Sequence, residues 1–286
     1  MKMIFLILIL LFTISISADN INNKKYIEEN NIVYNTVGDI KLLMDMKTLD
    51  DGKKNKPAVI AIHGGGWWEG SKTDGMWMGN PLVEKGYTVF AINYRLAPVA
   101  PFPAQIEDCK SAVRFVRANA KKYNIDPNKI IAYGGSAGGH LASLLGVLPK
   151  GKFEGTGNNL KTSSAVQAVI SNVGPEDLSL YTETDDKYAI RENNFKQLFG
   201  SNPEGMDYWI KAASPITYVT EKSVPHLLLY GSTDDLVPAS HGAVMEKKLK
   251  DNKVYCEYYV EEGAWHILST EYIIPKIDNF LEKILK

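Results

Sequence analysis

Short, almost entirely apolar segments recur along the chain and are separated by longer segments with a helical pattern. The strand-like runs lie near residues 32–37, 40–47, 57–62, 87–92, 129–133, 166–172, 226–230 and 254–260. Several of them, such as AVIAI, TVFAIN and HLLLY, have no polar face, which is typical of strands covered on both sides. The pattern therefore predicts a sheet whose central strands are buried on both faces.

Helical segments are expected between most of these strands, near residues 104–123, 137–147, 239–251 and 271–285. In the first of them, Ile106, Cys109, Val113 and Val116 recur at helical spacing, and Pro103 stands just before it. Alternating strands and helices predict an α/β fold, with a mostly parallel sheet of about eight strands and helices on both faces. The first two strands have no helix between them, so we expect an antiparallel edge.

The N-terminus has the pattern of an export signal. Lys2 precedes an apolar run over residues 3–16, and small residues follow before Asp19. A membrane anchor is the alternative, but the run is shorter than the ~20 residues that span a bilayer. We interpret residues 1–18 as a signal peptide and expect a periplasmic or extracellular protein with no membrane attachment. The polar residues 19–31 predict a linker, which leaves 32–286 as one domain.

Residues 174–215 interrupt the alternation with a polar and aromatic sequence. Their aromatic residues are Tyr181, Tyr188, Phe195, Phe199, Tyr208 and Trp209. An insertion between two core strands is well placed to form a small cap over a pocket. A structural excursion with its own small core is the alternative interpretation.

Charge and metal-binding patterns exclude several classes of function. The formal net charge is −1, so no basic excess attracts nucleic acid. No Cys/His cluster has metal-ligand spacing, so we expect no metal. Cys109 lies on the helical apolar stripe and Cys256 alternates with strand residues, so both are expected to be core thiols. A disulfide between them is the less favoured alternative.

The strongest chemical signal is the segment IIAYGGSAGGHLASLLG, in which a strand-like run ends in G-x-S-x-G and a helical run follows. This context predicts a sharp turn that exposes the hydroxyl of Ser136 as a nucleophile. Glycines on both sides relieve crowding at such a turn. A second run ends in His63 and HGGGW, and glycine loops of this kind aim backbone N–H groups at a developing oxyanion. We expect these donors at Gly65, Gly66 and Ala137, with Trp67 as a substitute.

A serine nucleophile needs a base, and the base needs an orienting acid. His266 lies in a loop after the last predicted strand, which is where the base belongs on such a fold. His63 is expected to hold the glycine loop, and His226 and His241 are interpreted as structural. The acid is expected just after the preceding strand, where the residues alone do not choose between Asp234 and Asp235.

The segments HGGGW, NYRLAP, FPAQIEDCKSAVRF, GGSAGGH, ASPITYV, GSTDDLVP and EGAWH together resemble the hormone-sensitive-lipase-like α/β-hydrolases. They are most similar to the bacterial branch of feruloyl and acetyl-xylan esterases, from about residue 35 to the end. The resemblance implies an α/β-hydrolase fold, ester hydrolysis without a cofactor, and an acid in a G-x-x-D-x-x-V-P pattern. That pattern favours Asp234. The resemblance also implies structural roles for Arg95 and Asp108.

One residue departs from the family pattern, because the position before the histidine is usually small and is Trp265 here. We expect Trp265 and Trp67 to border the substrate pocket, and Trp265 and residues 174–215 to limit the size of the acyl group. The expected activity is that of a serine carboxylesterase acting on short-chain or aromatic esters. The family resemblance implies that these include acetyl or feruloyl groups on plant polysaccharide. An amidase, a formamidase or a peptidase on the same fold, and a non-catalytic binding protein, are the alternatives.

Overall fold

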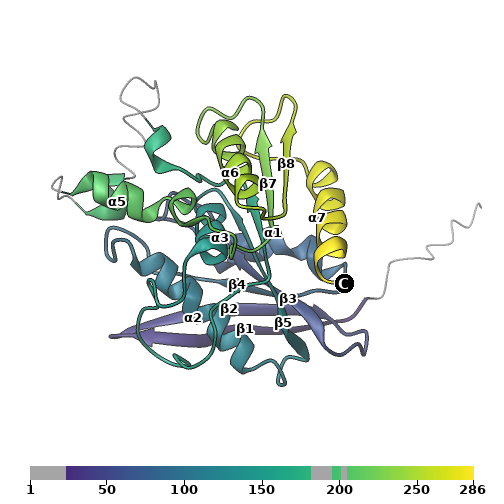
Figure 1. Ribbon diagram of the computed structural model, residues 1–286. Coiled ribbons are helices and arrows are strands. Elements are labelled where there is room, and N and C mark those ends of the chain that lie inside the picture. The colour runs from purple at the N-terminus through teal and green to yellow at the C-terminus, as the bar shows by residue number, and fades with distance from the viewer. Residues whose placement is uncertain (1–23, 182–194, 201–204) are drawn as a thin grey trace, which may run out of the picture.

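The computed structural model describes residues 24–181, 195–200 and 205–286, and its strands form one sheet in the order β1-β2-β4-β3-β5-β6-β7-β8 (Figure 1). The β1–β2 and β2–β4 pairs are antiparallel, and all other pairs are parallel. The predicted α/β-hydrolase sheet and its antiparallel edge are therefore confirmed. The strands are β1 (Tyr26–Val37), β2 (Ile40–Leu49), β3 (Lys56–Ile62), β4 (Thr88–Ile92), β5 (Ile125–Gly135), β6 (Ala168–Asn172), β7 (His226–Gly231) and β8 (Cys256–Glu261).

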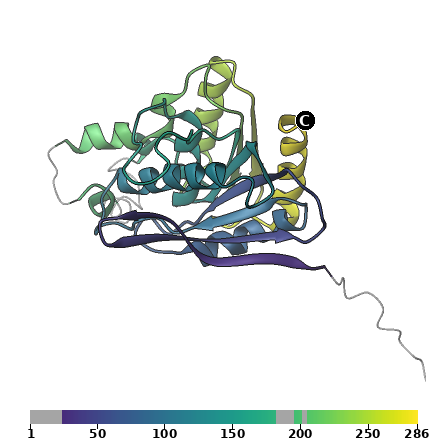
Figure 2. The same cartoon turned by 90° about the horizontal axis from the view of Figure 1, so that it is seen from below.

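Helices cover both faces of this sheet. They include α1 (Lys72–Val83), α2 (Ala104–Ala118), α3 (Ala137–Val147), α5 (Met206–Ala213), α6 (Ser240–Asp251) and α7 (Thr270–Ile284), with 3₁₀ turns at Leu178–Leu180 and Pro215–Tyr218. Apolar residues of α2 and α3 pack on one face, where α6 also lies, while α1 and α7 pack on the other. Figure 2 shows the long β1–β2 ribbon running beneath these layers.

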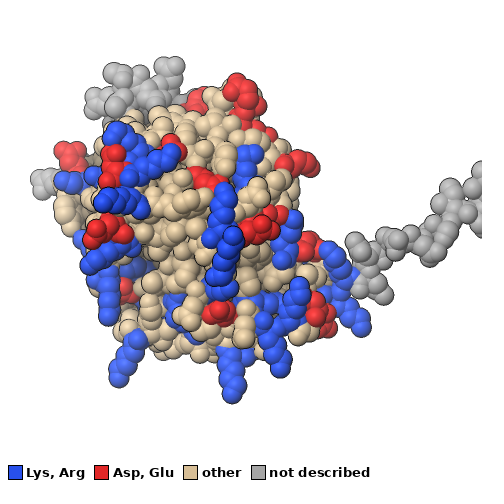
Figure 3. Space-filling view, turned by 45° about the vertical axis from the view of Figure 1, so that its right-hand side comes forward, with Lys and Arg blue, Asp and Glu red and all other residues tan. Residues whose placement is uncertain are grey.

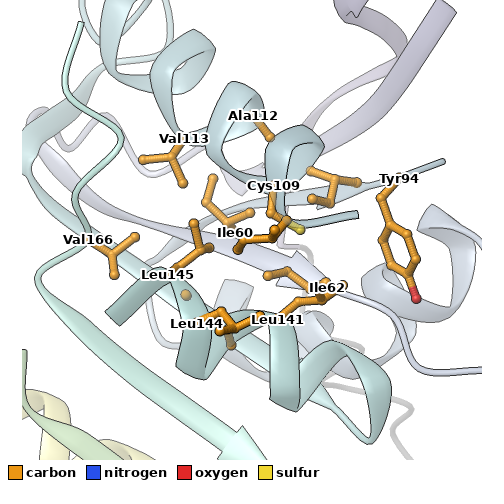
Figure 4. Close-up of a cluster of buried hydrophobic side chains, with 14 of the residues drawn as sticks. Ile60, Ile62, Tyr94, Cys109, Ala112, Val113, Leu141, Leu144, Leu145 and Val166 are labelled. Atoms are coloured by element: carbon orange, nitrogen blue, oxygen red, sulfur yellow. The ribbon is translucent and has the colours of Figure 1, made fainter. Parts of the chain in front are cut away.

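The alternation of side chains along β3 links the two cores. Ile60 and Ile62 belong to the core formed with α2 and α3, and Val59 and Ala61 face α1. Figure 4 shows Ile60 and Ile62 among side chains from both covering helices. Because successive strand residues point to opposite faces, an unbroken apolar run is what two-sided burial requires.

The two cysteines are free and buried in separate cores, Cys109 on α2 and Cys256 at the start of β8. The expectation of two core thiols is confirmed, and the alternative of a disulfide between them is wrong.

The expected linker over residues 19–31 is wrong in part, because β1 begins at Tyr26. Its backbone pairs with β2 from Tyr26 opposite Leu49 onward, and the register shifts between Glu29 and Ile32, where Asn31 has a positive φ of 58°. An edge strand is held by backbone hydrogen bonds and keeps one face in water, so polar side chains do not prevent it from forming. Residues 1–23, which include the predicted signal peptide, lie outside the described residues.

Helix α1 is absent from the sequence-based prediction because its residues are poor helix formers. It contains Gly75, Gly79 and Pro81, and glycine and proline are the weakest residues in a helix interior. The helix begins with a capping box in which Ser71 and Asp74 satisfy each other's backbone N–H groups. A Cβ atom at Gly79 would lie 2.7 Å from a methyl of Val89, so the small residues let α1 pack closely on the sheet.

Arg95 fastens the loop after β4 to helix α2. Its guanidinium donates to both carboxylate oxygens of Asp108 at 2.8–3.0 Å, and Asp108 also accepts from the backbone N–H of Arg95. Only 1% of the Asp108 side chain is exposed. The pair therefore has the structural role that the family resemblance implies.

Glu176 is a fully buried carboxyl group just beyond β6. The hydroxyls of Ser143 and Ser171 donate to its Oε1 atom, at 2.8 and 2.7 Å, and the Tyr230 hydroxyl lies 3.5 Å away. No cation pairs with Glu176 among the described residues. Burial raises the pKa of Glu176 to about 8, and the hydroxyls offset this effect only in part.

This shift predicts that the protein loses stability as the pH rises from about 4.5 to 8. In this range the unfolded chain releases the proton of Glu176 and the folded chain keeps it, so unfolding becomes more favourable. Glu176→Gln cannot ionise. The free energy of unfolding of Glu176→Gln is compared with that of the wild type at each pH. The difference, variant minus wild type, should be at least about 1 kcal/mol larger at pH 8 than at pH 5.

Denaturant unfolding of both proteins at the two pH values measures this difference. Glu221→Gln, at an exposed position, is the matched control and should follow the wild type. Parallel stability profiles for Glu176→Gln and the wild type would show that the buried carboxyl does not titrate in this range.

Candidate active site

Ser136 occupies a strained turn between β5 and α3. Its φ and ψ angles are 53° and −121°, a combination that non-glycine residues rarely adopt. Its backbone N–H donates to the Asn172 carbonyl at 2.8 Å, and its carbonyl accepts from the backbone N–H of His140 at 3.1 Å. The turn lifts the side chain above the carboxyl end of the sheet, where ligands of open α/β sheets bind.

Glycine is required on both sides of this turn. A Cβ atom at Gly134 would lie 2.0 Å from the Gly138 carbonyl oxygen, and one at Gly138 would lie 2.1 Å from that of Ile62. These contacts are shorter than any real Cβ contact, so the sharp turn and the close approach of α3 to β3 exclude any side chain at either position.

The structure brings Ser136, His266 and Asp234 together from three separate loops. The Nε2 atom of His266 lies 2.9 Å from the Ser136 Oγ atom, and its Nδ1 atom lies 2.7 Å from Oδ2 of Asp234. The Asp234 side chain is fully buried, and His266 is 13% exposed. The other oxygen of Asp234 accepts from the backbone N–H groups of Leu236 and Val237. With the proton on Nδ1, His266 can accept the serine proton at Nε2.

The two neighbouring aspartates have different partners. Asp235 lies 2.8 Å from the indole Nε1 atom of Trp265, which donates to its Oδ1 atom. Asp234 therefore lies against the histidine, and Asp235 fixes the tryptophan beside it. The residues alone did not choose between Asp234 and Asp235. The geometry favours Asp234, as the family pattern does.

Trp265 does not border the cavities beside Ser136, contrary to the expectation from the sequence. Its side chain is 51% exposed and is held by Asp235, and it lines neither cavity that reaches Ser136. Ile267 and Leu268, on the other side of His266, line the larger one instead. The hydrogen bond to Asp235 holds the indole at the surface of the protein.

Trp67 borders a cavity but is also a buried structural residue. Its indole N–H donates to the Nδ1 atom of His140 at 3.1 Å, and the Nε2 atom of His140 lies 2.6 Å from the Ala213 carbonyl. Burial lowers the pKa of His140 to about 4, so the ring is neutral and can accept at Nδ1 while it donates at Nε2. This chain of contacts joins the glycine loop to α3 and α5, a role that the sequence analysis did not assign to His140.

Gly65, Gly66 and Ala137, the expected oxyanion donors, line one cavity together with Ser136. Gly65 and Gly66 have positive φ angles of 97° and 55°, and a Cβ atom at Gly65 would lie 2.3 Å from the Glu69 carbonyl oxygen. Over the described residues, no backbone–backbone hydrogen bond of the loops and turns has its donor at Gly65, Gly66 or Ala137. They border the same cavity as Ser136, so they are available to an anionic oxygen there.

The remaining histidines are structural, as expected. His63 stacks on Tyr94 with ring centroids 4.2 Å apart, and its Nδ1 atom lies 2.8 Å from the Gly64 carbonyl. His226 is fully buried at the start of β7, with Nδ1 2.7 Å from the Val224 carbonyl. His241 is buried in α6, where its ring lies against Tyr181.

Two cavities meet at Ser136 and His266. The smaller has a volume of about 340 Å³ and the larger of about 720 Å³. The small cavity contains the oxyanion donors and is walled by Pro175, Tyr181, Phe195, Leu236 and Val237. The large cavity extends toward α1 and the start of α7. An ester bound at Ser136 therefore has a separate space for each of its two halves.

Part of the insertion 174–215 borders a cavity, and another part packs on the main domain. Tyr181 and Phe195 wall the small cavity, whereas Phe199 and Trp209 pack around Phe102 of the main domain. Residues 182–194 and 201–204, which include Tyr188, lie outside the described residues.

Among the residues that the structure describes, no group of three or more His, Cys, Asp or Glu side chains is arranged to hold a metal ion. No helix in the same part of the chain combines the length and the apolar character needed to cross a bilayer. Figure 3 shows basic and acidic side chains interspersed over the face that it displays.

Known proteins resemble this chain over most of its length. Esterase LipQ of Mycobacterium tuberculosis is 31% identical over 211 residues, which cover 73% of this chain and 49% of LipQ. The chain thus spans about half the length of this curated relative. A truncated carbohydrate esterase from gut microbiota superposes with a TM-score of 0.80 at 30% identity, covering 91% of this chain and 97% of that one.

A second solved structure is esterase 2 of Thermogutta terrifontis phosphonylated by sarin. It has a TM-score of 0.77 at 25% identity and covers 93% of this chain and 96% of its own. The same enzyme with butyrate bound gives a TM-score of 0.73 at 26% identity, covering 88% and 93%. The family model described as BD-FAE matches residues 44–249, which is more than half of the chain. The chain belongs to the BD-FAE family and has the α/β-hydrolase fold.

Proposed function

We propose that this protein is a serine carboxylesterase that hydrolyses short-chain or aromatic esters, including acyl groups attached to polysaccharide. The observation that carries the proposal is the continuous contact from Asp234 through His266 to the Ser136 hydroxyl. The esterases and the carbohydrate esterase that resemble the chain support the reaction class and the class of substrate.

Acylation begins when His266 removes the proton of Ser136 as the oxygen attacks the ester carbonyl. The buried carboxylate of Asp234 orients the ring and stabilises the imidazolium that forms. The carbonyl oxygen becomes negative and accepts hydrogen bonds from the N–H groups of Gly65, Gly66 and Ala137. The imidazolium then protonates the leaving alcohol, and the acyl group remains on the serine.

Deacylation repeats these steps with water in place of the serine hydroxyl. His266 removes a proton from water, the hydroxide attacks the acyl carbonyl, and Ser136 leaves with the proton returned by the ring. A related enzyme, esterase 2 of Thermogutta terrifontis, is phosphonylated by sarin, and the proposal extends such covalent reactivity to Ser136.

The acyl group occupies the small cavity in this proposal. That cavity contains the oxyanion donors, and its walls at Tyr181, Phe195 and Val237 are apolar or aromatic. Its volume of about 340 Å³ suits a short chain or a single ring. The large cavity is then left for the alcohol.

We also propose that the protein is exported, on the basis of the apolar signal pattern in residues 1–18. N-terminal sequencing of the protein recovered from the medium or periplasm should begin just after this segment. Retention of the intact N-terminus inside the cell would contradict export.

Ser136→Ala should lower kcat by about 10⁶-fold, the scale observed when a triad serine is removed from a serine hydrolase. The substitution leaves the glycine turn intact but removes the nucleophile. Steady-state hydrolysis of 4-nitrophenyl acetate measures the loss. Retention of more than about one hundredth of the activity in a folded variant would exclude Ser136 as the nucleophile.

Asp234→Asn should lower kcat by about 10⁴-fold, because the amide no longer holds the ring in the required tautomer. Asp235→Asn is the matched control, since it changes the adjacent carboxylate, which contacts Trp265 rather than the histidine. Its kcat should stay within about tenfold of the wild type. A greater loss of kcat in Asp235→Asn than in Asp234→Asn would show that Asp235, and not Asp234, is the acid.

Phe195→Ala should shift the preferred acyl chain toward longer esters, because it removes one wall of the small cavity. The wild type should prefer acetate and butyrate over chains of about ten carbons, since each methylene that finds room adds about 0.8 kcal/mol to binding and one without room clashes with the cavity wall. The values of kcat/KM over a chain-length series measure the optimum. Trp265→Ala is the aromatic control outside the cavities and should keep the wild-type optimum; a shift in this control alone would place the indole at the acyl group.

A further inference from the structure

A further cavity lies at the far end of helix α3 from Ser136. It has a volume of about 600 Å³ and is lined by Leu145 and Gly146 of the last turn of α3, and by residues just before β6 and β7. An α-helix rises about 1.5 Å per residue, so Gly146 lies about 15 Å along the helix from the nucleophile. Among the described residues, none that lines this cavity also lines the two cavities beside Ser136. The space is therefore separate from the proposed site of ester hydrolysis.

Part of the lining of this cavity is apolar. Leu145 and Val166, which are labelled in Figure 4, belong to the core beneath it, and Leu148 and Val224 are partly buried beside them. Leu160, on the loop before β6, lines the same cavity although it is 55% exposed. An apolar group bound here would remove these side chains from water, which is favourable in proportion to the area covered.

The rim of the cavity is basic. Lys150, Lys161 and Lys222 line it and are exposed, and their ammonium groups make no ion pair or hydrogen bond with any described residue. Glu154 is the one acidic residue among the described residues of the lining. The three lysines therefore give the cavity an excess of positive charge, although the whole chain has a net charge of −1.

Glu154 cannot neutralise these lysines, because other groups already occupy its carboxylate. Lys110 donates to Oε1 at 2.9 Å and Arg114 to Oε2 at 2.7 Å. The backbone N–H of Gly151 and the hydroxyl of Ser164 donate to the same two oxygens. The side chains of Lys110 and Arg114 are only 4% and 1% exposed. Two buried cations thus share one carboxylate, and an unbalanced positive charge remains behind the wall of the cavity.

The unbalanced charge affects the ionisation of Lys110. Burial lowers the pKa of its ammonium group, and the contact with Glu154 offsets this effect only in part. A further negative charge in the neighbouring cavity would stabilise the charged form of Lys110 without touching it, because charges interact strongly near the protein interior.

We propose that this cavity binds an amphiphilic anion, a molecule with an apolar chain or ring and one anionic head group. The apolar part lies against Leu160 and Val224, and the head group lies among the three lysines of the rim. The volume is that of a site for a small organic molecule. Carboxylates and phosphate monoesters with an apolar chain share this chemistry. The inference does not depend on the esterase function, because the cavity is remote from Ser136.

The binding test compares octanoate and octyl phosphate with 1-octanol, which has the same chain and no charge. NMR of protein labelled in the methyl groups of leucine and valine follows the titration. The signals of Leu160 and Val224 should shift with at least one anion, at an affinity at least about tenfold above that for 1-octanol, because three positive charges surround the head group. The anion that binds more tightly identifies the head group.

Two results would overturn the proposal. The first is an affinity for 1-octanol equal to that for both anions. The second is a set of shifts confined to Leu236 and Val237, which line the small cavity and would place the anion beside Ser136 instead.

A triple variant, K150Q/K161Q/K222Q, locates the head group. All three positions are exposed, so the fold should be unaffected. The variant should bind the preferred anion at least about tenfold more weakly, because each exposed charge contributes about twofold or more, and its affinity for 1-octanol should not change. Hydrolysis of 4-nitrophenyl acetate should also be unchanged, since these lysines lie outside both cavities beside Ser136.

The control is K41Q/K54Q/K253Q, which removes the same amount of charge at exposed positions that line none of these three cavities. It should keep the wild-type affinity for the anion. An equal loss of affinity in the two triple variants would show that the net charge of the protein, and not this cavity, attracts the anion. An unchanged affinity in K150Q/K161Q/K222Q would exclude the three lysines as the site of the head group.

Discussion

The site depends on the strained backbone of Ser136. A serine with a φ of 53° costs free energy that the surrounding contacts must offset. The bond from its N–H to Asn172 and the absence of side chains at Gly134 and Gly138 allow this conformation. The strain places Oγ at the end of the sheet, within reach of His266 and next along the chain to the N–H of Ala137. Without this turn the other residues of the site would have no common point of contact.

The position of the turn also divides the space around the nucleophile. The loop after β3 and the insertion bound the small cavity on one side, and α1 with the start of α7 bounds the large cavity on the other. The two spaces differ in chemistry, because the small one is walled mainly by apolar and aromatic side chains, whereas the lining of the large one includes charged residues such as Lys47, Asp74 and Glu84. This difference is the physical basis for assigning the two halves of an ester to opposite sides of Ser136.

Residues close together in a motif were predicted well from the sequence. The apolar runs indicated the parallel sheet. The G-x-S-x-G segment indicated the sharp turn at Ser136 and the HGGGW segment indicated the loop at Gly65, because each depends on its neighbours along the chain. The contact of Ser136 with Asp234 and His266 was expected from the order of the motifs along the chain, but other contacts between distant segments were not. Helix α1 was missed because Gly75, Gly79 and Pro81 conceal a helix that is stabilised by packing on the sheet. Trp265 was misplaced because its direction depends on a hydrogen bond to Asp235, 30 residues away.

The central claim is that the reaction proceeds through an acyl group on Ser136, and trapping that intermediate tests it most directly. Wild-type protein mixed with 4-nitrophenyl acetate and quenched in acid within milliseconds can be digested and mapped by mass spectrometry. The account predicts an acetyl group on the peptide that contains Ser136, attached to the serine oxygen, with none in unmixed protein. An acetyl group found only at another residue, or rapid hydrolysis with no acetylated peptide at any quench time, would contradict it.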